Sequence, residues 1–231
     1  MNITDNALQT ESKMELLDLE TWERAEHYNF FGHMQNSQYG FTVQQDVTEL
    51  CAYRKDQIGC SVKIRFSSML YYLATRAANE IPEFRTRRID GKPVIFDVIH
   101  PAFTYIPKGR NLHANCLCRL GNDFCDTAAN IEAARDAADA NPTLTPAGGD
   151  KQNLFYFSIV SGVEFTSASN PWGDSADTAP RILFGNITEN ESGRKIMSIS
   201  IEARHEFMDG KHFGEFFSKF DAMCKKPGEY L

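Results

Sequence analysis

The segment IMSISIEARHEFMDGKH, residues 196–212, constrains the fold more than any other part of the chain. Apolar and polar residues alternate along it as far as His205, which is the pattern of a β-strand with one face on a hydrophobic core. His205 falls on the apolar face, so the pattern predicts a titratable ring held at the end of a rigid strand. Such a ring suits a general base, although core histidines with a purely structural hydrogen bond give this pattern more often.

Other periodic segments predict a mixture of strands and helices. Strands are expected over 41–47, 103–106, 154–165 and 181–187, and a hairpin over 85–99 around an Asp-Gly turn. Helices are expected over 21–28, 64–80 and 123–140, and again after His205, where phenylalanines form a stripe. No change of composition marks a linker. We therefore predict a loose leader over residues 1–14 and one domain over 15–231. Its fold class should be α+β, a two-layer sandwich in which helices pack on a large mixed β-sheet.

Composition and charge argue against several classes of protein. With 231 residues the chain can bury a sizeable core, and its net charge of −7, without a dense Lys/Arg block, disfavours a nucleic-acid partner. No apolar run has the length of a membrane span, and the N-terminus lacks a signal-peptide pattern, so we expect a cytoplasmic protein with no membrane partner.

The cysteines of a cytoplasmic protein should be reduced thiols. Cys116 and Cys118, between His113 and Cys125, lack the usual spacing of zinc ligands, which leaves a structural zinc site as the minor alternative.

Four segments, in order along the chain, resemble the chloramphenicol acetyltransferase family. They are TWERAEHYNFF (21–31), PEFRTRRIDGKPVIFDVIHPAFT (82–104), FSIVSGVEFTS (157–167) and HEFMDG (205–210). The last matches the family's H-x-x-x-D-G signature, which dihydrolipoamide acyltransferase cores share. The likeness extends from about residue 18 to about residue 222, and four ordered segments make it far more specific than the signature alone.

The resemblance implies acetyl transfer from acetyl-CoA to a substrate hydroxyl without a metal. His205 would be the general base, and Ser158 would donate a hydrogen bond to the oxyanion of the intermediate. Asp209 would pair with Arg24 and hold the frame of the site, not relay a proton. A rival alignment puts Ser167 or Ser169 in place of Ser158, but that serine would lie too close to His205 in the sequence.

Family resemblance also implies a homotrimer with each site between two subunits. Ser158 and a small-molecule acceptor pocket formed by Phe30, Phe31 and Phe103 would then face His205 across the interface. For each phenylalanine, plain core packing explains the residue equally well.

Several positions depart from the family pattern, and they lie in the expected walls of the site. Phe31 stands where the family usually has a tyrosine, Leu183 where it has a threonine, and Arg204 where the antibiotic enzymes have a second histidine. A buried pocket hydroxyl can discriminate strongly between acceptors, so we expect weakened recognition of chloramphenicol and possible use of another hydroxylated small molecule.

Three further interpretations compete with this one. One is an acyltransferase that uses a lipoyl domain or another acyl carrier, which would have to act in trans because the sequence shows no lipoyl domain or Pro/Ala linker. His205, Asp209 and His212 have i, i+4, i+7 spacing and would present three metal ligands if the segment were a helix. The chain could instead be a non-catalytic trimeric ligand-binding relative, although such a protein has no need of the base and the serine.

Overall fold

The computed structural model describes residues 12–53 and 58–231, and its centre is a six-stranded mixed sheet. The strand order is β2-β9-β8-β7-β5-β6, in which β5, β7 and β8 run parallel and the other neighbours are antiparallel. The strands are β2 (Gln38–Asp46), β5 (His100–Tyr105), β6 (Ala114–Leu117), β7 (Leu154–Ile159), β8 (Arg181–Glu189) and β9 (Lys195–Arg204). The predicted large mixed sheet is confirmed.

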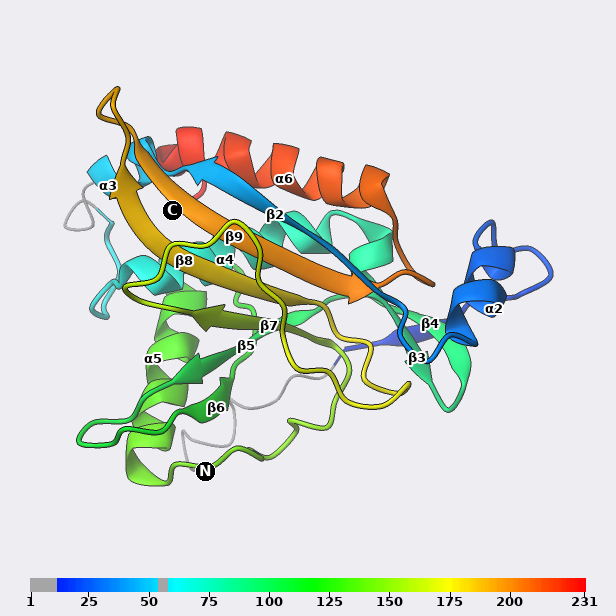
Figure 1. Ribbon diagram of the computed structural model, residues 1–231. Helices are drawn as coiled ribbons and strands as arrows, with labels where there is room; N and C mark the ends of the chain where they lie inside the picture. Colours follow the sequence, from blue (N-terminus) through cyan, green and yellow to red (C-terminus); the bar gives the residue numbers. More distant parts are fainter. Residues whose placement is uncertain (1–11, 54–57) are drawn as a thin grey trace.

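Helices lie against one face of this sheet, which confirms the predicted two-layer α+β arrangement (Figure 1). The helices are α2 (Ala25–Gly32), α3 (Thr48–Ala52), α4 (Phe66–Asn79), α5 (Phe124–Ala140) and α6 (Gly210–Lys225), with 3-10 turns η2 (Pro82–Arg85) and η3 (Pro227–Glu229). Helix α2 begins four residues later than expected and projects beyond the end of β9 (Figure 1). In the described part of the chain, no helix is both long and apolar enough to cross a membrane.

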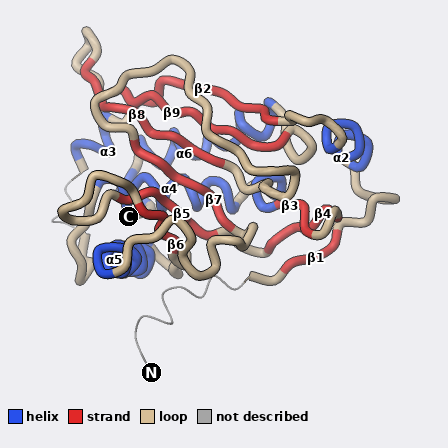
Figure 2. Tube along the Cα trace, turned by 60° about the horizontal axis from the view of Figure 1, so that its bottom comes forward, coloured by secondary structure: helices blue, strands red, loops and turns tan. Residues whose placement is uncertain are grey.

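The predicted hairpin forms a separate three-stranded sheet, not part of the large one. Strands β3 (Thr86–Ile89) and β4 (Lys92–Phe96) pair around Asp90, which has a positive φ of 49° in the turn, and β1 (Met14–Leu16) pairs with β4. The small sheet lies beside α2 at one end of the molecule (Figure 2). The expected leader is thus wrong for residues 12–14, because Lys13 and Asp97 exchange hydrogen bonds and Met14 begins a strand. Residues 1–11 of that leader lie outside the described part.

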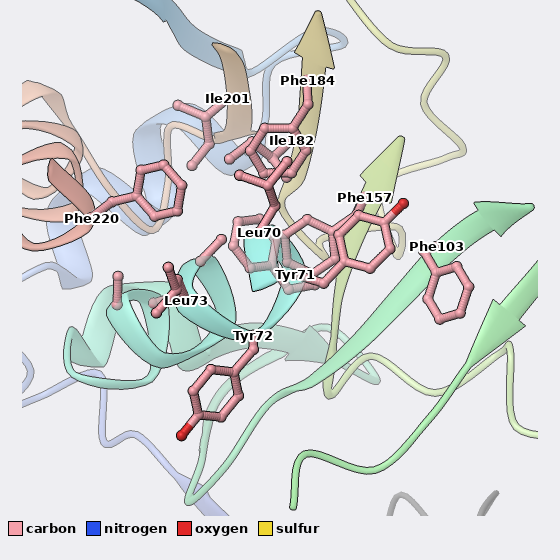
Figure 3. Close-up of a cluster of buried hydrophobic side chains, with 14 of the residues drawn as sticks. Leu70, Tyr71, Tyr72, Leu73, Phe103, Phe157, Ile182, Phe184, Ile201 and Phe220 are labelled. Carbon is pink, nitrogen blue, oxygen red and sulfur yellow. The ribbon is translucent and has the colours of Figure 1, made fainter. Parts of the chain in front are cut away.

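Aromatic side chains fill the space between the sheet and α4. The Tyr71 ring of α4 stacks on Phe157 of β7 and on Phe103 of β5, with centroid separations of 5.0 and 5.1 Å (Figure 3). All three side chains are at most 2% exposed. Since side chains alternate along a strand, Thr104 and Ser158 must point to the opposite face, away from α4.

Strand β9 is buried on both faces, whereas the alternation predicted burial of one. Met197, Ile199 and Ile201 face the helices as expected. On the other face Ser200 donates to the carbonyl of Ala168, Glu202 accepts from the backbone N–H of Asn170, and Arg204 donates to the carbonyl of Asp177. These three partners lie in the loop between β7 and β8, which crosses the front of the sheet in Figure 1. Polar side chains are therefore buried there because a distant loop supplies their hydrogen-bond partners.

This loop also shortens the strand predicted over 154–165. β7 ends at Ile159, and the chain turns at Gly162, where φ is +77°. Phe165 then folds back over the sheet, so that a Cβ at Gly185 would come within 2.8 Å of its ring. Glycine at 185 is what allows the loop to approach β8 so closely.

The expectation that every cysteine is a free thiol is wrong for two of them. Cys60 and Cys125 form a disulfide with a Cα separation of 5.1 Å, which links the segment before α4 to the first turn of α5. Cys116 and Cys118 are buried free thiols, and burial raises the pKa of Cys116 to about 11. Because Cys125 is bonded to Cys60, it is not available as a thiolate ligand beside Cys116 and Cys118, and the zinc alternative loses one of its ligands.

Candidate active site

His205 follows directly on β9 and is fixed by two hydrogen bonds. Its backbone N–H donates to the carbonyl of Ser37 at 2.7 Å, and its ring Nδ1 lies 2.9 Å from the carbonyl oxygen of Met208. A carbonyl oxygen only accepts, so Nδ1 must carry the hydrogen. In the neutral ring Nε2 is then left with its lone pair, as a general base requires.

Two aromatic rings enclose the imidazole from either side. Phe31 of α2 stacks on it at a centroid distance of 4.0 Å, and Tyr39 of β2 stacks on it at 4.1 Å with an interplanar angle of 6°. The expectation that Phe31 faces His205 only across a subunit interface is therefore wrong, because it contacts the ring within one chain. Sequence reasoning missed Tyr39, although the alternation that begins at Phe41 extends back to it.

Arg24 and Asp209 form the expected ion pair, with 2.8 Å between Arg24 Nη1 and Asp209 Oδ2. Arg24 Nη2 also donates to the carbonyl of His205 at 3.1 Å, so the guanidinium joins the two ends of the HEFMDG segment. Burial alone would raise the pKa of Asp209, but the Arg24 hydrogen bond, His212 and the Lys211 N–H outweigh it and hold that pKa below its usual value.

The arrangement required for a three-ligand metal site is not present. Helix α6 begins at Gly210, so His205 lies before the helix and uses Nδ1 on a carbonyl. His212 Nδ1 accepts from the N–H of Asp209 in a capping box, which leaves Nε2 protonated and 3.4 Å from Glu83. No cluster of three metal-ligating side chains occurs in residues 12–53 and 58–231.

A second buried ion pair lies beside His205 and was not foreseen. Arg88 Nη2 is 3.3 Å from Glu206 Oε1, and the Glu206 side chain is 2% exposed. Arg88 also donates to the hydroxyl of Tyr28, on the helix that carries Phe31. The pair therefore joins the small sheet, α2 and the turn after β9, but each partner alone looks like an ordinary surface charge in the sequence.

Ser158 lies at the carboxyl end of β7, with its hydroxyl 2.8 Å from that of Thr104 on β5. Both line a pocket of about 440 Å³ together with Phe103 and His113. Phe103 is 2% exposed and belongs mainly to the core, and Phe30 is 64% exposed, with its ring edge on Phe31. The three phenylalanines expected around the acceptor are therefore in three different environments. Of the rival serines, Ser167 and Ser169 both line another groove, beside Phe41 and Ser200.

Ser158 and His205 do not meet within one chain. Ser158 is level with Leu183 and, through it, with Ser200, and His205 lies five residues further along β9. Five residues span about 17 Å, and the two strand spacings between β7 and β9 add about 10 Å sideways. The two side chains also point to opposite faces, since His205 stacks on Tyr39 on the helix-covered side. One copy of the chain cannot place one substrate against both.

Comparison with known proteins assigns the family. Residues 12–221 match the family model of chloramphenicol acetyltransferase. The chain belongs to the chloramphenicol acetyltransferase family. Chloramphenicol acetyltransferase 2 of Haemophilus influenzae is 26% identical over 90% of this chain and 95% of its own length. The enzyme of Streptomyces acrimycini is 28% identical over 91% and 94%.

Solved structures agree with this assignment. A chloramphenicol acetyltransferase superposes with a TM-score of 0.81 at 28% identity, covering 92% of this chain and all of that one. A dihydrolipoamide acetyltransferase of Azotobacter vinelandii shares the fold, with a TM-score of 0.66 at 16% identity over 89% and 88% of the two chains. The chain is thus an acyltransferase of a family that uses acetyl-CoA as cosubstrate, and acetyl transfer is the implied reaction.

Proposed function

We propose that this protein transfers an acetyl group directly from acetyl-CoA to a hydroxyl of a small molecule, with residues 15–231 as one acyltransferase domain. The observation that supports this best is the state of His205, whose Nδ1–H is bound to a carbonyl and whose Nε2 is free to accept a proton. The stacked rings of Phe31 and Tyr39 keep that imidazole in one orientation.

In the proposed reaction His205 Nε2 takes the hydroxyl proton as the hydroxyl oxygen attacks the thioester carbon. The Ser158 hydroxyl donates to the oxyanion of the tetrahedral intermediate, while Thr104 donates to Ser158. The intermediate then expels the CoA thiolate, which takes the proton back from His205. The products are the acetyl ester and free CoA, and no acyl-enzyme forms.

A homotrimer would bring the two groups together. Because Ser158 and His205 lie on opposite faces of the sheet and far apart along it, we infer that His205 of one copy acts with Ser158 of the next. In each such site two copies contribute one essential group each, so a lone chain should be inactive.

Chloramphenicol is one candidate acceptor, and resistance to it is one candidate biological role. The ring of Phe31 contacts His205 but carries no hydroxyl to bind the antibiotic.

We propose the cytoplasm as the compartment, since acetyl-CoA is supplied there. Disulfides are rare in that compartment, so titration of the thiols in freshly lysed cells tests it: four free thiols per chain would indicate an oxidised Cys60–Cys125 pair, and six a reduced one.

The direct test is thiol release from acetyl-CoA, with and without chloramphenicol and other alcohols. Wild type should release thiol only when an acceptor is present, and His205→Ala should lower the rate by several orders of magnitude because no other group takes the proton. His33→Ala, at an exposed histidine, is the matched control and should retain the rate. Absence of His205-dependent release with a broad panel of alcohols would favour the non-catalytic alternative.

A further inference from the structure

Positive side chains line the pockets around Ser158, and the acidic side chains of the described residues lie behind them. A pocket of about 470 Å³ at the carboxyl ends of β5 and β7 is lined by Ser158, Thr104, His113, Arg65 and Arg135 among others. The adjoining pocket shares Thr104, His113 and Ser158 and adds Arg181. Among the described residues, no aspartate or glutamate lines either pocket, although the protein as a whole carries a net charge of −7.

From this charge distribution we propose that the natural acceptor is an anionic alcohol, a hydroxylated small molecule bearing a carboxylate or phosphate group that Arg65 binds. The inference rests on the proposed acyltransferase function and assigns the class of its second substrate.

Arg65 and Arg135 share a single carboxylate. Arg65 Nε lies 3.2 Å from both oxygens of Glu132, and Glu132 also pairs with Arg135, in the described part of the chain. Among the described residues, both guanidinium groups thus pair with one carboxylate, so the cluster of Arg65, Arg135 and Glu132 carries one net positive charge. The neighbouring carboxylates are engaged elsewhere: Asp139 with Lys108 and the Tyr105 hydroxyl, Asp177 with Arg181, and Glu202 with Asn170.

The two arginines have different tasks in this arrangement. Arg135 is 4% exposed, with its nitrogens on Ser67, Ser68 and Glu132 and its guanidinium 5.4 Å from the centre of the Phe103 ring. It is a fixed charge beneath the pocket. The Arg65 side chain is 42% exposed and, in the part of the chain that the structure describes, hydrogen-bonds through Nε alone, to Glu132, so its terminal nitrogens remain available to an anion. A guanidinium binds carboxylate or phosphate through two parallel hydrogen bonds.

The charge fits the acceptor better than it fits CoA. The phosphates of CoA lie at the far end of a long pantetheine arm from the thioester, whereas Arg65 lines the same pocket as Ser158, where the thioester carbonyl must sit. A pocket for a neutral, largely apolar acceptor such as chloramphenicol gains nothing from a guanidinium that must be desolvated when the acceptor binds.

The test compares acceptors that differ only in charge. His205-dependent thiol release is measured with 3-(hydroxymethyl)benzoate against 3-(hydroxymethyl)benzamide, with their 4-isomers, with glycerol 3-phosphate against glycerol, and with chloramphenicol. Wild type should prefer at least one anionic member by roughly tenfold or more in kcat/KM. The benzoate–benzamide pairs measure a preference for a carboxylate, and the glycerol 3-phosphate–glycerol pair measures a preference for a phosphate.

Three variants assign that preference to Arg65. Arg65→Gln should reduce the anionic-to-neutral ratio by about tenfold through the KM of the acceptor, and Arg65→Lys should restore most of it. Arg119→Gln, at an exposed arginine that lines neither pocket, should leave the ratio unchanged.

Two outcomes would overturn the inference while leaving the proposed function intact. One is His205-dependent release that is as fast with the neutral members, or with chloramphenicol, as with every anionic one. The other is an Arg65→Gln variant whose defect lies in the KM of acetyl-CoA. Absence of release with every acceptor would overturn the proposed function itself, and this inference with it.

Discussion

The proposed catalytic base is oriented by backbone carbonyls and ring contacts, not by a carboxylate. His205 Nδ1 is bound to the carbonyl of Met208, and Asp209 is occupied by Arg24 and by the N-terminus of α6. An aspartate four residues after a histidine suggests a charge relay, but here it caps a helix and anchors an arginine. Its effect on catalysis should therefore pass through the position of the HEFMDG turn.

The ion pair between Asp209 and Arg24 should contribute measurably to the stability of the fold. Asp209→Asn keeps the helix cap but leaves Arg24 without its partner, and we expect a loss of about 1–2 kcal/mol in the free energy of unfolding at neutral pH. Because the pKa of Asp209 is lowered in the folded state, its contribution is complete above its unfolded pKa of about 4 and disappears as the pH falls through the lower, folded value.

Urea unfolding of both proteins across the acidic range will measure this. The curves of free energy against pH should converge below about pH 4. Equal stabilities at neutral pH would show that the pair contributes nothing.

A second prediction separates the two hydroxyls at the carboxyl ends of β5 and β7. Ser158→Ala should lower kcat by about 100-fold, because the oxyanion loses its donor. Thr104→Val should cost less, since Ser158 remains but loses the group that orients it. Steady-state kinetics on both variants should show these losses in kcat, with the KM of the acceptor nearly unchanged. A Ser167→Ala variant with the larger defect would favour the rival alignment.

Among the helices and strands, the sequence predicts those whose burial is determined by their own residues. The alternation before His205 predicted β9, and the apolar stripe from Phe66 to Ala77 predicted α4. The second buried face of β9 was not predictable, since its covering residues lie some thirty positions earlier in the loop before β8. The three-residue β1 and four-residue β6 were too short to show a period.

The same distinction applies to the candidate site. The Arg24–Asp209 pair came only from the family resemblance, because residues 185 positions apart carry no local signal of contact. Glu132 and Arg135 lie on one face of α5, as their i, i+3 spacing allows, but nothing in the sequence shows that Arg65 joins them. The charge of the pocket is therefore a property of the fold.

The Cys60–Cys125 disulfide gives a prediction for α4 and α5. It closes a loop of 65 residues, and its removal should lower the free energy of unfolding by about 2–4 kcal/mol. The Cys60→Ser/Cys125→Ser double variant tests this by urea unfolding against wild type. Cys51→Ser serves as the control, because Cys51 is not part of the Cys60–Cys125 disulfide. Dithiothreitol should destabilise wild type and leave the double variant unchanged.

At the scale of the whole molecule, the separation of Ser158 from His205 predicts complementation between inactive subunits. Ser158→Ala and His205→Ala proteins should each be nearly inactive. After they are unfolded together and refolded, mixed trimers should contain some sites with both native groups, and a sizeable fraction of wild-type activity should return. Sedimentation should show a trimer throughout. Inactivity of the refolded mixture, with mixed trimers present, would mean that both groups act within one chain.

The disulfide also affects how the molecule responds to force. The covalent ring from Cys60 to Cys125 contains α4, the hairpin, Phe103 and Thr104, and so most of one wall of the Ser158 pocket. When the two chain ends are pulled apart, the sulfur–sulfur bond carries the force and the residues inside the ring do not. The contour length of the oxidised protein, when fully stretched, should therefore be shorter than that of the reduced protein by roughly 230 Å. This is the length of the enclosed residues at about 3.6 Å each. The pocket wall would remain a closed loop in a chain that is otherwise fully extended.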